Sequence, residues 1–258
     1  MLEAGLWAAA GQSALLVGAL LVARFPKLTE PRWLGLVMAF GAGALISAVT
    51  TDLVAEAYHE AGRAPTGVGL LVGALGYYGL TRWLDLRAER EDPEEPVDEA
   101  VVESVEAMPQ GADATAARNL TVGMVLDGIP ESIAVGLTLL GGASVSFALV
   151  GAVFLSNLPE AIGVAAALLA GGISLKKVLL RFAAIVAVGF AAGFIGYAVL
   201  DSSNADAIAI IQSIAAGAMV VVIVNEMVPI AVRGAGRRAG LAAAAGFAVA
   251  AFLSTINT

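Results

Sequence analysis

DGIPESIAVGLTLL (residues 127–140) and SNLPEAIGVAAALL (residues 156–169) are two versions of one pattern. Each stretch has proline and then glutamate at its fourth and fifth positions, and each lies in apolar sequence long enough to cross a membrane. An unpaired carboxylate in the middle of such a helix costs roughly 2.5–3.5 kcal/mol on insertion scales, so its presence indicates a functional site. The two stretches therefore predict a pair of membrane-spanning helices that carry a polar site.

Both stretches belong to a chain whose composition excludes an ordinary soluble domain. Of its 258 residues, 59% are hydrophobic and 14% are charged, and the mean hydropathy is +0.87. A soluble domain usually carries about 25% charged residues. The chain has no cysteine, which excludes disulfides and thiolate metal sites. The N-terminal apolar stretch lacks a basic leading region, so it predicts a first membrane span and not a cleaved signal peptide.

The sequence predicts an all-α membrane protein with eight transmembrane helices. The predicted spans are residues 5–23, 33–57, 66–84, 119–140, 146–170, 178–200, 207–231 and 239–256. An acidic segment, residues 85–118, is expected to be a disordered cytoplasmic loop, with metal capture or regulation as the alternative role. It separates spans 1–3 (residues 1–84) from spans 4–5 (residues 119–170), which carry the site and precede spans 6–8 (residues 171–258).

Basic residues give the predicted orientation. If the N-terminus is outside, the outside connections hold only Arg63, which leaves 13 of the 14 Lys and Arg residues on the inside. Because Lys and Arg concentrate in cytoplasmic connections, this distribution predicts a multi-pass protein of the cell membrane with both termini extracellular or periplasmic.

Two pairs of spans are similar in sequence and are predicted to run in opposite directions. Residues 41–56 of the second span align with residues 215–230 of the seventh, which places Asp52 on Glu226. The fourth and fifth spans align through their Pro-Glu motifs. We therefore expect spans 1–3 and 6–8 to be inverted repeats, with spans 4 and 5 as an inverted central pair. Inverted repeats are typical of secondary transporters that bind their substrate near the membrane midplane.

Five residues form the predicted metal site: Asp127, Glu131, Ser156, Asn157 and Glu160. Residues four apart share a helix face, so the acids of the fourth span can face the polar residues of the fifth. Each proline also leaves the carbonyl four residues earlier without its helical partner. No Lys or Arg lies mid-span, so a bound cation or protonation must neutralise the three carboxylates. The alternative is that the prolines only bend the helices and the acids only pack.

Pro-Glu motifs on the fourth and fifth of eight spans resemble the paired signatures of the Zrt/Irt-like (ZIP) metal transporters. There the fourth span usually reads His-Asn-x-Pro-Glu-Gly, and the fifth has a His or Gln before x-x-Pro-Glu-Gly. Here Asp127 and Gly128 replace the His-Asn pair, and Ser156 stands where the fifth-span ligand would be. Only Glu131 and Glu160 match the ligands of the resembled family. The resemblance covers nearly the whole chain, including the outside termini and the long cytoplasmic loop.

The resemblance implies a secondary transporter that moves a divalent cation such as zinc, manganese or iron into the cytoplasm by alternating access. Oxygen donors replace the family's nitrogen donors, and carboxylates and carbonyls suit manganese, magnesium and calcium better than imidazole does. The sixth span has no acidic residue, so a single metal is the safer expectation. The cation would be a substrate and not a cofactor, and no enzymatic activity is expected.

A second group of polar residues lies near the ends of the second and seventh spans: Asp52, Glu56, Asn225 and Glu226. The resemblance implies that they line the path of the ion. The alternative is that they reach the membrane interface or cap helices.

Other functions remain open from the sequence. One is transport of protons or another non-metal cation, and a second is a transport-inactive membrane protein that senses metal. A membrane metal hydrolase is disfavoured because such enzymes normally need His ligands to place a reactive water. The expected partners are the metal cation, the lipid bilayer and, as one option, a second copy of the chain, but not nucleic acid.

Overall fold

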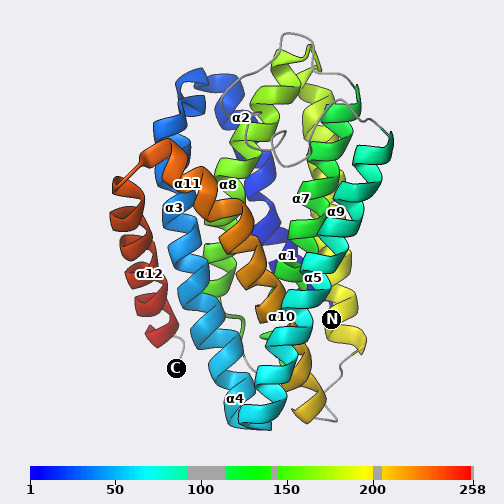
Figure 1. The fold of residues 1–258 in the computed structure, drawn as a ribbon, viewed down its shortest axis with the longest axis vertical. Helices are drawn as coiled ribbons and strands as arrows, with labels where there is room; N and C mark the ends of the chain where they lie inside the picture. Colours follow the sequence, from blue (N-terminus) through cyan, green and yellow to red (C-terminus); the bar gives the residue numbers. More distant parts are fainter. Residues whose placement is uncertain (92–113, 141–143, 200–204, 257–258) are drawn as a thin grey trace.

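The computed structural model describes residues 1–91, 114–140, 144–199 and 205–256, and the regular secondary structure within these ranges is helical (Figure 1). The long helices lie roughly side by side in one bundle. Their bounds are α1 Leu2–Gln12, α2 Ala14–Arg24, α3 Pro31–Ala48, α4 Ala55–Ala61, α5 Arg63–Glu91, α7 Ala114–Leu137, α8 Phe147–Ala170, α9 Leu175–Val199, α10 Ala205–Val222, α11 Val228–Ala235 and α12 Arg238–Ile256.

Six stretches of the described chain are long and apolar enough to cross a membrane. They are Leu2–Arg24, Pro31–Ala61, Phe147–Ala170, Leu175–Val199, Asp206–Ala235 and Arg238–Thr255. The all-α membrane prediction is therefore confirmed, and these six agree with predicted spans to within a few residues. The other two predicted spans correspond to the long helices α5 and α7. The described part of α7 includes the apolar stretch Gly128–Leu137.

The predicted acidic loop is shorter than expected at both ends. Helix α5 continues to Glu91, and α7 begins at Ala114, so the first and last residues of the predicted 85–118 loop are helical. Residues 92–113, which make up the rest of that loop, lie outside the described residues.

The predicted first span is divided in two. Helix α1 ends at Gln12 and α2 begins at Ala14, with Ser13 between them. The Ser13 hydroxyl donates to the carbonyl of Ala10 at 2.6 Å, and such bonding to the preceding turn competes with regular helical geometry.

Two long helices each contain a π-helical segment. The segment η2, Val49–Val54, joins α3 to α4, and η4, Ile223–Met227, joins α10 to α11. The alignment of residues 41–56 with residues 215–230 places one segment on the other, and each contains the aligned acid, Asp52 or Glu226. Because π segments are rare and occur often at functional sites, their shared position is an independent likeness between the two helices.

The same two helices make matching crossings with their neighbours. A Cβ on Gly43 of α3 would collide with the carbonyl of Ala243 in α12, and one on Gly217 of α10 would collide with the carbonyl of Leu70 in α5. In the reverse sense, Gly246 of α12 lies against Phe40, and Gly73 of α5 lies against Ile214. The contacting positions therefore correspond in pairs. Positions 40 and 43 of α3 correspond to 214 and 217 of α10, and positions 70 and 73 of α5 correspond to 243 and 246 of α12.

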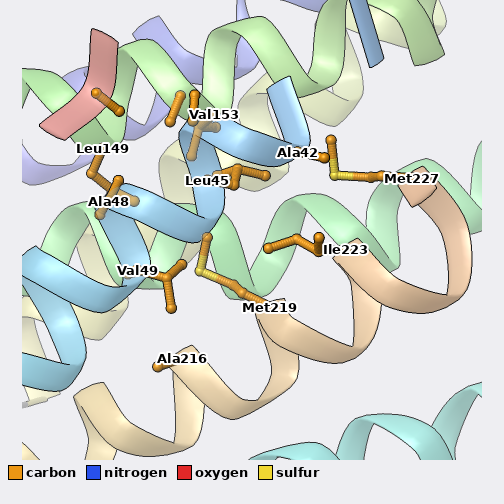
Figure 2. Packing of buried hydrophobic residues seen from close by; sticks show 14 of the residues in the cluster. Ala42, Leu45, Ala48, Val49, Leu149, Val153, Ala216, Met219, Ile223 and Met227 are labelled. Carbon is orange, nitrogen blue, oxygen red and sulfur yellow. The ribbon is translucent and has the colours of Figure 1, made fainter. Parts of the chain in front are cut away.

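Helix α8 occupies the interior of the bundle, since 72% of its most apolar stretch is buried against other parts of the protein, compared with 17% for α12. Figure 2 shows side chains of α3, α8, α10 and η4 meeting in one cluster, with Leu45, Val153, Met219 and Ile223 among them. The helix that carries Ser156, Asn157 and Glu160 is therefore enclosed by other helices of the bundle.

Candidate metal site

Glu131 is the buried carboxylate at the centre of the candidate site. It follows Pro130 inside α7, and only 4% of its surface is exposed. Its Oε2 accepts a hydrogen bond from Nδ2 of Asn157 at 2.7 Å, and its Oε1 accepts one from the Ser156 hydroxyl at 3.3 Å. Both carboxylate oxygens are thus directed at neighbouring residues of α8, as the paired motifs predict.

The two partners of Glu131 are held in place by their own helix. The Asn157 amide also donates to the carbonyl of Val153 at 2.9 Å, and the Ser156 hydroxyl lies 2.9 Å from the same carbonyl. Ser156 and Asn157 are 4% and 3% exposed. Because their rotamers are fixed by these bonds, Glu131 lies in a preformed set of oxygen and amide groups.

The remaining two residues of the predicted site are less well defined. Asp127 lies in α7 one turn before Glu131, but its side chain is outside the described part of the structure. Glu160 lies one turn after Ser156 in α8 and is half-buried. Within the described residues, no three Asp, Glu or His side chains are grouped closely enough to form a metal-binding cluster.

Helix α3 reaches this level of α8 through a glycine. A Cβ on Gly41 would come within 2.9 Å of the Ser156 Cα and 3.0 Å of the Leu155 carbonyl oxygen. Pro159 cannot donate to that carbonyl, which is the one four residues before it. Gly41 therefore allows α3 to lie close to the turn of α8 in which Pro159 removes one backbone hydrogen bond.

Asp52 connects three segments at one end of α8. Its Oδ1 accepts from the hydroxyls of Thr51 at 2.7 Å and Ser254 at 2.9 Å, and its Oδ2 accepts from the hydroxyl of Ser146. Ser146 is also the N-cap of α8, where its Oγ accepts from the backbone N–H of Leu149 at 3.0 Å. The π segment η2 is thus tied to the first turn of the helix that carries the site.

The other predicted path residues lie near polar partners on different helices. Glu56 accepts from the Gln212 amide at 3.1 Å, and Glu226 accepts from the Tyr77 hydroxyl at 3.3 Å. Asn225 is exposed in η4. The described residues therefore place Glu56 and Glu226 at contacts between helices.

Two buried polar residues beside the site escaped the sequence analysis. Gln12 is fully buried, and its Nε2 donates to the carbonyl of Gly128 at 3.2 Å, one turn before Ser132, which is 1% exposed. The available signal was a single glutamine in the middle of an apolar span. Buried polar groups in a membrane are costly and mark functional positions, so that glutamine could have been selected on the same grounds as Glu131.

Long apolar helices around a buried, hydrogen-bonded carboxylate define a multi-pass membrane protein with an intramembrane polar site. The sequence profile of the ZIP zinc transporter family matches residues 4–254, which is almost the entire chain. The chain belongs to this family, and the resemblance deduced from its Pro-Glu motifs is confirmed. It is accordingly a membrane transporter of divalent metal ions. A search of curated individual proteins gave no match.

Replacing Asn157 with Asp is expected to destabilise the metal-free protein and to enlarge the stabilisation caused by divalent metal. The change removes a hydrogen bond to a carboxylate, worth about 1.5–3 kcal/mol, and brings a second carboxylate next to Glu131. Thermal unfolding of the purified protein, with and without manganese or zinc, checks this. An equal metal-induced rise in Tm for the variant and the parent would contradict it.

Proposed function

We propose that the protein is a secondary transporter that binds one divalent cation at Asp127, Glu131, Ser156, Asn157 and Glu160 and carries it toward the cytoplasm. The observation that supports this site best is the burial of Glu131 between α7 and α8, with both of its oxygens facing Ser156 and Asn157. A carboxylate in such a place is most stable when a cation is bound to it.

The donors proposed for the ion are all oxygens, apart from an amide that can present its oxygen by rotation. Such a set suits manganese and other hard ions, and it binds zinc with less discrimination than imidazole does. We therefore expect manganese, zinc and iron to compete for one site. The exchange of the family's His for Asp127 and Ser156 is the main reason to test ions other than zinc.

Alternating access is the proposed mechanism, with the pair α7 and α8 moving relative to the other helices. It is supported by the shared position of η2 and η4 and by the matching crossings of α3 and α10. These likenesses are those expected of inverted repeats around a central pair. We take α5 and α7 as the two further spans of an eight-span protein. Both ends of the chain lie in the lower half of Figure 1, which agrees with an even number of spans.

The ion's proposed path runs past Asp52 and Glu56 on one side and past Asn225 and Glu226 on the other. The corresponding positions of Asp52 and Glu226 in the two π segments support a role for each on the path between the site and one membrane surface. The hydroxyls bound to Asp52 and the Tyr77 hydroxyl near Glu226 would exchange with an ion that passes.

Flux through purified protein in lipid vesicles tests the proposal. We expect saturable uptake of manganese, zinc, iron or cobalt, at least about 10-fold slower in Glu160→Gln and unchanged in the exposed control Glu60→Gln. Parent-like uptake by Glu160→Gln would contradict the site. Binding without flux of any divalent ion would indicate a sensor, and flux that needs no divalent metal would indicate transport of another cation.

A further inference from the structure

A second polar group lies on the face of α7 next to the one that carries Glu131. Positions 128 and 132 share one helix face, and positions 127 and 131 share the adjoining face, since successive residues are about 100° apart. The first of these faces is directed at Gln12 of α1 and Gly189 of α9. A Cβ on Gly128 would come within 2.9 Å of the Gln12 Nε2, and one on Gly189 within 2.8 Å of the Gln12 Cγ.

Gln12 and Ser132 are buried and incompletely hydrogen-bonded within the described residues. Gln12 is 0% exposed and Ser132 is 1% exposed, yet the Gln12 Oε1 and the Ser132 Oγ have no hydrogen-bond partner there. The two side chains lie beside the same glycine, because a Cβ on Gly189 would come within 2.8 Å of the Gln12 Cγ and within 2.9 Å of the Ser132 Oγ. Buried polar atoms normally have partners, so this acceptor and this hydroxyl each point to a polar partner that the described side chains do not supply.

A purely structural role accounts for the amide nitrogen of Gln12 but not for its carbonyl oxygen. The bond from its Nε2 to the Gly128 carbonyl would hold α1 against α7. Its Oε1 contributes nothing to that contact, and burying an acceptor without a partner costs free energy. An apolar side chain of similar length would avoid the cost, so the carbonyl end of Gln12 requires its own explanation.

We propose that Gln12 is a positioning residue of the ion site: its Nε2 fixes the Gly128 turn, while its Oε1 and the Ser132 Oγ accept hydrogen bonds from water that hydrates the bound divalent cation. This inference rests on the function proposed above. Metal-bound water is a strong donor because the cation draws charge from it, and neutral oxygens are suitable acceptors. Hard divalent cations commonly keep several of their waters when they bind to proteins.

Binding of manganese and zinc to the full-length purified protein tests this inference by titration calorimetry. Gln12→Met removes both polar ends at similar length, and we expect about 10-fold weaker binding with no fall in the Tm of the metal-free protein. Ser132→Ala is expected to weaken binding several-fold. Ser213→Ala is the matched control, because its buried hydroxyl donates to its own helix at the Ala209 carbonyl at 2.7 Å.

Gln12→Glu separates a role at the ion from a role in packing. In its protonated form Glu presents an O–H donor to the Gly128 carbonyl and an acceptor in place of the Gln12 Oε1, so it should recover the binding lost in Gln12→Met and make metal affinity depend more strongly on pH. Parent-like affinity in Gln12→Met overturns the proposal. The proposal is also overturned if Gln12→Met lowers both the metal affinity and the Tm of the metal-free protein, and Gln12→Glu restores neither the affinity nor the Tm. Should Gln12→Met fail to fold, parent-like affinity in Ser132→Ala overturns it.

A parallel titration of Glu131→Gln keeps the two proposals distinguishable. If Glu131→Gln loses affinity while Gln12→Met and Ser132→Ala do not, the ion site stands and only the water-positioning role fails. If Glu131→Gln binds metal like the parent, the ion site itself is wrong.

Discussion

Replacing Glu131 with Gln is expected to weaken the binding of divalent metal by at least roughly 100-fold. Removing one charge of a buried charge pair typically costs about 3–5 kcal/mol, and each 1.4 kcal/mol corresponds to a tenfold change in affinity. Glu131 is 4% exposed, so little solvent is available to compensate for the lost charge. Titration calorimetry with manganese and zinc on the detergent-solubilised protein measures the change.

The same variant is expected to leave the metal-free fold intact. Gln has the volume of Glu, and its carbonyl oxygen can still accept from the Asn157 amide. A metal-free Tm close to that of the parent would therefore separate loss of binding from loss of structure. Glu60→Gln makes the same chemical change at an exposed position of α4 and serves as the control. Parent-like affinity in Glu131→Gln would show that this carboxylate is not a ligand.

Gly43→Ala is expected to be among the most destabilising single-methyl changes in the chain. The added Cβ would collide with the carbonyl of Ala243, and a backbone atom cannot move aside as a flexible side chain can. Forcing extra volume into a packed interior costs about 1–3 kcal/mol or more. We expect a clearly lower Tm, together with a lower yield of folded protein in detergent, measured by thermal unfolding and size-exclusion chromatography.

Gly76→Ala provides the matched control, because it makes the same change inside a long helix. No described atom outside its immediate surroundings lies within 4 Å of a Cβ placed on Gly76. Alanine is about 1 kcal/mol better than glycine in a helix interior, so Gly76→Ala should be neutral or stabilising. Gly217→Ala, whose Cβ would meet the carbonyl of Leu70, should resemble Gly43→Ala. Equal Tm values for the Gly43 and Gly76 variants would contradict the close crossing of α3 and α12.

The contact of Glu131 with Ser156 and Asn157 followed from the spacing of residues. Pro-Glu motifs on consecutive apolar segments placed Glu131 opposite Ser156 and Asn157, and the structure joins these three by hydrogen bonds. The meeting of these two helix faces was predictable because a helical period and a short connection leave few ways for them to meet, whereas binding of an ion there remains a proposal. The roles of Asp127 and Glu160 at the ion remain predictions.

Features that depend on contacts between distant segments were not predictable in this way. Gln12 is the single amide side chain in an apolar run, and nothing in its neighbouring sequence shows that it faces Gly128 of α7. The π segments are equally hidden, because an extra residue in a helical turn leaves no mark on composition. Small residues let membrane helices pack closely, but only the coordinates separate Gly43, where an added methyl group would meet the Ala243 carbonyl, from Gly76, where it would meet open space.

Under the proposed alternating-access mechanism, the matched glycine crossings would also affect the relative populations of the two end states. If an inverted pair of halves exchanges roles during transport, the α3–α12 and α10–α5 interfaces exchange roles as well. Both interfaces pack a glycine against a backbone carbonyl at corresponding positions. The packing free energy lost at one interface in such an exchange would therefore be nearly equal to the packing free energy gained at the other. Only the residues that differ between the halves then set the energy gap, and a small gap lets a modest ion gradient shift the populations.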